Sequence, residues 1–410
     1  KTKTFSNTSQ TENILNQIQF IKQNSGKFLW ANMEELAKDI LSELQNTYPN
    51  VLLSTCGDYR RKMITLSSVD FLMAEESVKI QNEIKEKYKQ YPVVFHFCNK
   101  NNFYFKLLEL SSAPEHFSFL SYKINTENNY HSEEEIYSSA GFPFIIPELR
   151  DNKLEWNLVE LNKLNQLIEL QDIKGIVHNH SKYSDGANTL KEMALYVKEQ
   201  GFEYFVISDH SKSAFYANGM KEEIILKQHL EIEQLNTELA PFKIFKSVES
   251  DILNDGSLDY DEAILQSFDL IIASVHSQLK MPEEKAMQRL LKAIENPYTT
   301  ILGHLTGRLL LSREGYPINH KKIIDACAAN KVCIELNANP YRLDMDYQWI
   351  DYCQEKNVLI SINPDAHHLQ GIHDIRYGVY AARKGGLLKQ NTLNTLSKDN
   401  FEKYIAHKKH

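Results

Sequence analysis

Cysteine and long apolar runs are both scarce in this sequence. Its five cysteines are scattered through 410 residues, and no two of them form a Cys-x-x-Cys pair. An odd, dispersed set is typical of reduced thiols in an intracellular protein rather than of a disulfide framework. No uninterrupted apolar run reaches the roughly 18 residues needed to cross a bilayer, and the chain opens without a signal-peptide pattern. We therefore expect a cytoplasmic protein with no membrane segment.

A surplus of positive charge is also missing. The formal net charge is −8 and the sequence pI is about 6.0, which argues against a general basic coat for nucleic acid. Any DNA contact then has to come from local patches or from metal ions. Histidine is unevenly distributed, because only three of the 15 histidines precede residue 170. Charge does not explain this asymmetry, whereas metal chemistry in the second part of the chain would.

A chain of this length exceeds one typical core, so we expect two domains, at 1–150 and 174–410, joined by a linker at 151–173. In the first part, helical periodicity predicts helices at 11–24 and 33–44. Apolar runs predict strands at 51–55 and 68–73, with a turn over Cys56–Arg61 between them.

This order resembles the palm of the family X DNA polymerases, within the nucleotidyltransferase superfamily. The matching residues are Gly57, Arg60 and Arg61 in the turn and Asp70 in the following strand. The segments 17–27 and 141–150 likewise resemble the helix that leads into that palm and the end of its thumb. The resemblance implies an α+β palm and thumb domain. The small lyase and helix-hairpin-helix domain of that family is expected to be absent.

The palm departs from the polymerase pattern at its metal ligands. Such polymerases hold two magnesium ions with an Asp-x-Asp pair and a third Asp on a neighbouring strand, but here the pair reads Ser68-Val69-Asp70. The third carboxylate is expected near Phe105–Leu108, where none occurs, and Glu109 is out of step. We therefore expect a core that has lost nucleotidyl transfer and serves to hold DNA, with the turn residues and Asp70 vestigial. The simpler interpretation of Asp70 is a solvated or capped acid.

The second part alternates apolar runs with helical stretches, which is typical of βα units around a parallel sheet or barrel. One strand leads into residue 178, and six more are predicted at 205–208, 245–248, 270–274, 300–303, 332–336 and 359–362. Most of them end beside a residue that can bind metal. Because chemistry in such barrels lies in the loops after the strands, these residues should converge on one rim.

The segment Gly175–Gly186 opens this series. Side chains alternate across a strand, so His178 and His180 should leave it on the same face. Gly186 is free to adopt positive φ, which would let Asp185 fold back over the strand end. A His pair at this spacing is by itself as often an ordinary feature as a ligand pair, but one ligand-type residue after nearly every strand is improbable by chance.

Together the strand-end strings resemble the PHP (polymerase and histidinol phosphatase) domain, in the form fused to bacterial family X polymerases. The resemblance implies a distorted (βα)7 TIM-like barrel and a site for three divalent metal ions, Mn, Zn or Fe. Its nine ligand positions are matched here by His178, His180, Asp185, His210, Glu249, His276, His304, Asp365 and His367.

Charged neighbours of these positions have candidate roles. Arg308 and Lys212 are candidate phosphate clamps, with surface charges as the alternative interpretation, and Arg342 and Arg376 are weaker candidates. Asp209 is expected to orient the neighbouring ligand imidazole.

The leading functional hypothesis is a metal-dependent phosphoesterase acting on DNA 3′ ends, gaps or nicks in repair. It would work as a 3′-5′ exonuclease or 3′-phosphatase, with cleavage at abasic sites as a further option. The alternatives are a small-molecule phosphatase of the histidinol-phosphate type, a non-catalytic DNA-binding scaffold and an active gap-filling polymerase. Metal identity, preferred DNA end and oligomeric state are left open by the sequence.

Overall fold

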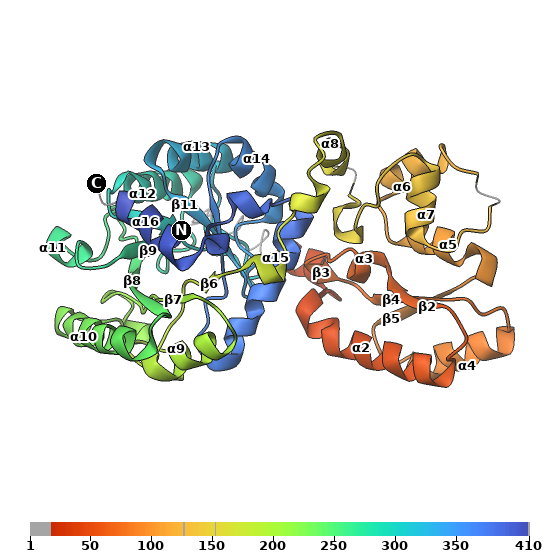
Figure 1. Cartoon of the computed structure of the whole chain (residues 1–410), viewed down its shortest axis with the longest axis horizontal. Coiled ribbons are helices and arrows are strands. Elements are labelled where there is room, and N and C mark those ends of the chain that lie inside the picture. Colours follow the sequence, from red (N-terminus) through yellow and green to blue (C-terminus); the bar gives the residue numbers. More distant parts are fainter. Residues whose placement is uncertain (1–17, 126–127, 152, 409–410) are drawn as a thin grey trace, which may run out of the picture.

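The computed structural model describes residues 18–125, 128–151 and 153–408, and within them the chain forms two bodies (Figure 1). The smaller body contains the first strands and helices, and the larger one is the barrel that begins at residue 175. Helix α15 (Ile375–Lys384), from late in the barrel, lies between the two (Figure 1). Within the described residues, no helix is both long and apolar enough to cross a membrane.

The smaller body is built on a three-stranded sheet. Its strands β2 (Leu53–Cys56), β4 (Val69–Met73) and β5 (Val93–Phe97) are ordered β2-β4-β5, with β2 antiparallel and β5 parallel to β4. Helices α2 (Trp30–Thr47) and α4 (Val78–Tyr88) bury apolar residues against it. The predictions for 33–44, 51–55 and 68–73 are therefore confirmed. Residues 18–24 are helical as expected, and 11–17 lie outside the described residues.

The position expected for a third palm carboxylate is wrong. Residues 105–108 belong to helix α5 (Phe103–Leu110), so they cannot supply a strand beside Asp70. The neighbouring strand is β5, which pairs Asp70 with Val94 and reads Val-Val-Phe-His-Phe. Neither β5 nor β2, the strand on the other side of β4, carries a carboxylate.

A helical layer with its own apolar core completes this body. It contains α5, α6 (Pro114–Ser121), α7 (Glu133–Ser139) and α8 (Glu155–Glu160). The segment expected to be a linker is packed rather than open, because Leu158 and Leu167 join that core and Leu167 pairs with Leu388 of the barrel.

The larger body is a barrel of seven parallel strands, which confirms the predicted (βα)7 fold. Its sheet order is β12-β11-β10-β9-β8-β7-β6. The strands are β6 (Gly175–Ile176), β7 (Tyr204–Ile207), β8 (Lys243–Asp251), β9 (Leu270–Ser274), β10 (Thr299–Leu302), β11 (Cys333–Asn337) and β12 (Ile360–Asn363). Between them run α9 (Leu190–Glu199), α10 (Glu222–Leu239), α11 (Glu262–Leu265), α12 (Glu283–Glu295), α13 (His320–Asn330) and α14 (Ile350–Glu355), and α16 (Lys398–Lys408) closes the chain.

Strands β6 and β12 form no ladder with each other, and two contacts bridge the gap between them. At the carboxyl end, Asn179 and Ala366 form an isolated parallel bridge. Deeper in the barrel, the buried Asn394 side chain bonds the backbone of Ile362 and donates to the carbonyl of Gly175. These contacts satisfy strand-edge groups that would otherwise be buried unpaired, and they bring the first and last strand ends together.

Helix α15 ties the two bodies to each other through ion pairs. Arg376 lies 3.1 Å from Glu34, Arg383 2.8 Å from Glu148 and Lys384 2.5 Å from Asp151. Beside these pairs, the Trp30 ring of α2 packs edge-on against Tyr377 and Tyr380.

Candidate metal centre

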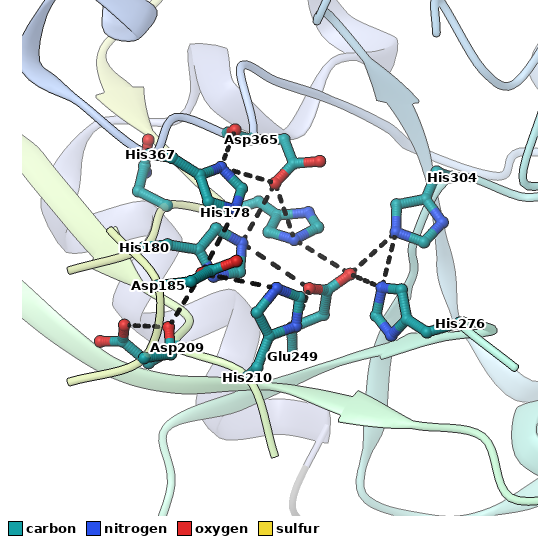
Figure 2. Close-up of polar contacts among 12 residues, drawn as sticks. His178, His180, Asp185, Asp209, His210, Glu249, His276, His304, Asp365 and His367 are labelled. Carbon is teal, nitrogen blue, oxygen red and sulfur yellow. Dashed lines mark hydrogen bonds and ion pairs between the residues drawn. The ribbon is translucent and has the colours of Figure 1, made fainter. Parts of the chain in front are cut away.

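The nine predicted ligand residues all lie together at the carboxyl ends of the barrel strands. Figure 2 shows their side chains directed toward one another around Glu249. Three overlapping groups have ligand atoms within 4.8 Å of one another: His180, Asp185, His210 and His367; His178, His180 and Asp365; and His210, Glu249 and His276. The ninth residue, His304, adjoins the third group, with its Nε2 3.2 Å from Nε2 of His276.

The backbone reaches this arrangement by a different route from the one predicted. Strand β6 ends at Ile176, and His178 has a φ of 64°, so strand alternation does not explain why the rings of His178 and His180 lie 5.3 Å apart. Gly186 is not in the positive-φ region either. It is required for close approach, because a Cβ there would lie 2.5 Å from the carbonyl oxygen of His180.

Glu249 is the central carboxylate of the cluster, and each of its oxygens faces more than one imidazole. Oε1 lies 2.9 Å from His304, 3.1 Å from His276 and 3.3 Å from His178, and Oε2 lies 3.0 Å from His210 and 3.6 Å from His180. A carboxylate offers two oxygens to metal, whereas an imidazole offers one nitrogen lone pair. Glu249 is therefore placed where it could bridge two ions.

Asp365 closes the opposite side of the cluster. Its Oδ1 lies 3.1 Å from His180, and its Oδ2 accepts a hydrogen bond from Asn337 at 3.0 Å. Asp185 faces the same space, 3.4 Å from His367 and 3.7 Å from His210.

The donor set fits divalent transition metals. Within the described part of the chain, Nε2 of His178, both ring nitrogens of His180 and Nδ1 of His210 are buried without a hydrogen-bond partner, a costly arrangement unless another group satisfies them. Burial and the facing imidazoles of His367 and His210 lower the pKa of His180 to about 3, which keeps the ring neutral with one nitrogen lone pair available. Burial opposes ionisation of Glu249, but the surrounding imidazoles hold its pKa well below the usual range. Mixed nitrogen and carboxylate donors suit Mn, Fe or Zn.

Two buried acids that received no role from the sequence support these imidazoles. Glu335 on β11 lies 2.5 Å from Nδ1 of His178, and its other oxygen accepts the backbone N–H of His304 at 2.6 Å. Asp251, two residues after Glu249, lies 2.5 Å from Nδ1 of His276. Such contacts fix which imidazole nitrogen faces the metal. The sequence did contain a signal for Glu335. It lies near the carboxyl end of β11, which was the one predicted strand without an assigned ligand.

The role predicted for Asp209 is not supported. Its buried carboxylate accepts hydrogen bonds from Ser181 and Ser184, at 2.6 to 2.8 Å, and from Gln228 at 2.7 Å, rather than bonding a ligand imidazole. Burial raises the pKa of Asp209 to about 6. The residue anchors the turn that carries Asp185, and Figure 2 shows it at the lower left, beside the cluster.

The two predicted phosphate clamps point elsewhere. The guanidinium of Arg308 bonds the backbone oxygens of Arg342 and Leu343 and lies 2.5 Å from Asp346, so it holds the loop after β11. Lys212 pairs with Glu222 at 2.8 Å on the outer surface. Of the weaker candidates, Arg376 serves the contact with Glu34 described above, whereas Nε of Arg342 lies 3.7 Å from Oδ2 of Asp365. Arg342 is the better placed cation.

In the smaller body, the charged residues that match the polymerase turn and the strand after it form hydrogen bonds and ion pairs with other residues of the chain. Asp70 accepts from Ser68 Oγ at 2.7 Å and lies 2.9 Å from Nε2 of His96. Gly57 has a φ of 62°, and a Cβ there would lie 3.1 Å from Cβ of Asp70. Arg60 makes two contacts with Glu133, and the neighbouring arginine, Arg61, pairs with Asp58 and Asp151. These contacts give Asp70 and both arginines partners within the protein.

Comparison with known proteins places residues 177–339 in the PHP domain family. The chain is 35% identical over 367 residues to the DNA polymerase/3′-5′ exonuclease PolX of Bacillus subtilis (strain 168), covering 85% of this chain and 64% of that relative's length. It is 25% identical to a Thermoanaerobacter sp. (strain X514) protein named "Probable phosphatase", covering 57% of this chain and 94% of that protein. A solved histidinol phosphate phosphatase of Lactococcus lactis, complexed with zinc, L-histidinol and phosphate, matches at 18% identity with a TM-score of 0.39, covering 52% of this chain and 94% of that one.

Proposed function

We propose that this chain, whose residues 177–339 match the PHP domain family and which is similar to a bacterial PolX protein, is a metal-dependent phosphoesterase that trims the 3′ ends of DNA. The observation that carries the proposal is the convergence of nine histidine and carboxylate side chains at one barrel rim, with buried imidazole nitrogens left unpartnered. The smaller body, which we call the palm-like body because its sequence resembles a polymerase palm, supports DNA as the substrate. A phosphatase that acts on small molecules would not need such a body.

The nine residues would hold divalent ions together, and Glu249, which has two oxygens, could serve more than one ion, whereas each imidazole would serve one. Bound divalent ions lower the pKa of water from about 15.7 toward about 7 and neutralise the charge on the phosphate. His178 and His276 would be held in their binding orientation by Glu335 and Asp251, whose carboxylates accept their Nδ1–H groups.

The chain's own contribution to hydrolysis is binding and positioning. In the reaction, a water oxygen bonds to phosphorus and the bond from phosphorus to the leaving 3′ oxygen breaks. That oxygen leaves with a proton, so one water is consumed for each 5′-nucleotide released. Arg342, next to Asp365 at the rim, is placed to pair with a non-bridging phosphate oxygen. No side-chain nucleophile is required.

We further propose that the palm-like body holds DNA without nucleotidyl transfer. A two-magnesium site needs several carboxylates that face a shared space. Here Asp70 is bonded to Ser68 and His96, and the adjacent strand β5 offers no acid.

One gapped DNA substrate with a labelled primer tests both bodies. With Mn²⁺ and all four dNTPs present, the primer should become shorter rather than longer, and His180→Ala should abolish the shortening because it removes a residue shared by two of the three ligand groups. Leu230→Ala, at an exposed position on α10, is the matched control and should retain the wild-type rate.

An intact primer in the presence of Mn²⁺, Zn²⁺ or Fe²⁺ would contradict the exonuclease proposal, and a lengthened primer would contradict the proposal for the palm. Turnover of histidinol phosphate in a parallel reaction, with DNA ends left intact, would instead indicate the small-molecule phosphatase.

A further inference from the structure

The loop between His210 and α10 exposes two adjacent aromatic rings. Phe215 and Tyr216 lie in a short 3-10 turn, Phe215–Ala217, and are 86% and 69% exposed. Leaving large apolar side chains in water forgoes the stabilisation that burial would give. Neighbouring exposed rings of this kind are typical of a surface that binds something.

The loop is held rigidly by groups on both sides of these rings. Ser213 donates from its backbone and its hydroxyl to Asp259, and Tyr260 donates to the carbonyl of Met220. Ala214 and Ala217, which flank the rings, are fully buried. The same loop therefore buries its small residues and presents its large ones to solvent. Such an arrangement orders the backbone that carries the rings before any ligand arrives and so reduces the entropy lost on binding.

One of the two rings, that of Tyr216, also lies at the edge of the candidate metal centre. The Tyr216 ring centroid is 6.2 Å from that of His210 and 6.4 Å from that of His276. A ligand that places a phosphate on the cluster would therefore bring its neighbouring atoms over this loop. The occupant has to combine a phosphate with a flat apolar face, and a nucleotide has both.

We propose that Phe215 and Tyr216 form a stacking platform for the terminal base of the DNA strand whose phosphate is cleaved. This inference rests on the proposed function, and it names two residues that would recognise the 3′-terminal base of the substrate. A base inside a strand is stacked on both faces, whereas the base at the 3′ terminus has one face free and can offer it to the platform. Stacking on an aromatic ring tolerates every base, because each has a π-face.

The test compares two labelled single strands that differ only at the 3′ terminus. One ends in an ordinary nucleotide, and the other ends in a tetrahydrofuran residue that keeps the sugar and phosphate but lacks the base. Release of the terminal residue is measured with Mn²⁺ as kcat/KM for wild type, Phe215→Ala, Tyr216→Ala, Tyr216→Phe and the control Leu230→Ala.

Wild type should favour the base-bearing end, because one stacked base changes affinity by about 5- to 150-fold. Each alanine variant should reduce that preference by several-fold. Tyr216→Phe should retain it, since the ring remains, and Leu230→Ala should match wild type. Both rings are exposed, so thermal melting of the variants should be unchanged.

Equal wild-type rates on the two ends would overturn the stacking platform while leaving the exonuclease intact. An unchanged preference in both alanine variants would do the same. If wild type releases neither terminus, the proposed function itself fails, and the platform fails with it.

Discussion

The substitution Glu335→Gln tests whether a buried acid that binds no substrate controls the metal centre. In the wild type, Glu335 accepts from Nδ1 of His178 at 2.5 Å, from Nδ2 of Asn363 at 2.7 Å and from the backbone N–H of His304 at 2.6 Å. Glutamine has nearly the same shape, but it offers one acceptor oxygen and two N–H donors. The change therefore removes an acceptor without opening a cavity.

The structure fixes the size of the expected effect. If the glutamine oxygen takes the place of Oε1, it still serves His178 and Asn363, but its amide then faces the N–H of His304, donor against donor. An unsatisfied buried donor costs about 1–3 kcal/mol, so the metal-free variant should be less stable by that amount. Loss of the negative partner also makes the His178 imidazole a poorer ligand, and changes of this kind cost about 10- to 100-fold in metal affinity.

Both quantities can be measured directly. Urea unfolding of the metal-free protein gives the stability difference, and metal retained after dialysis against graded chelator gives the affinity. Glu295→Gln, at an exposed position at the end of α12, is the matched control and should change neither. Manganese affinity within about twofold of wild type, together with unchanged stability, would refute the argument that Glu335 holds His178 for binding.

Two further predictions concern Asp209 and Lys62. Asp209→Asn should destabilise the protein by about 1–3 kcal/mol, because four hydrogen bonds converge on this carboxylate. Amide hydrogen exchange should become faster in the turn at 181–186. Unchanged exchange in that turn would contradict the anchoring role of Asp209. Lys62, with Nζ 4.0 Å from the Trp30 ring centroid and 4.4 Å from that of Tyr380, has its pKa lowered by burial to about 8. In the unfolded chain Lys62 keeps its proton up to about pH 10.5, whereas in the folded protein it loses the proton above about pH 8. The free energy of unfolding should therefore rise with pH between about 8 and 10.5, by at most about 3 kcal/mol. The rise is smaller if the aromatic rings stabilise the charged form. Lys62→Met should therefore be more stable than wild type at pH 7, with the gap narrowing by pH 10 in urea unfolding; a wild type that is the more stable at pH 7 would show that the ring faces outweigh burial.

The seven barrel strands could be predicted because each is a local pattern. A short apolar run between helical stretches reports its own secondary structure, and the observed strands lie within a few residues of the predicted ones. Parallel βα units place all strand ends on one rim, so the sequence also predicted that the ligand-type residues after the strands would meet, and the resemblance to the PHP domain supplied the set of nine. This convergence needed no knowledge of individual contacts.

Several of the failures have a different physical cause, since the partners of the side chain are distant in the sequence. Arg308 lies beside a predicted ligand, yet its partners are 34 to 38 residues away, in the loop after β11. Glu335 bonds His178 across 157 residues. In the palm, the neighbour of β4 was misassigned because Phe103–Leu110 is apolar on too many sides to reveal whether it is a strand or a helix.

The sequence by itself determined which residues could bind metal and that they would share one end of a parallel barrel, because strand periodicity and residue chemistry are local properties. Only the tertiary structure decided which charges face that centre and which are occupied elsewhere. It assigned Arg342 rather than Arg308 to the rim, made Asp209 an anchor for a turn, and set the Tyr216 ring beside His210. A side chain's direction depends on whichever partner the fold brings to it, and no local pattern records that partner.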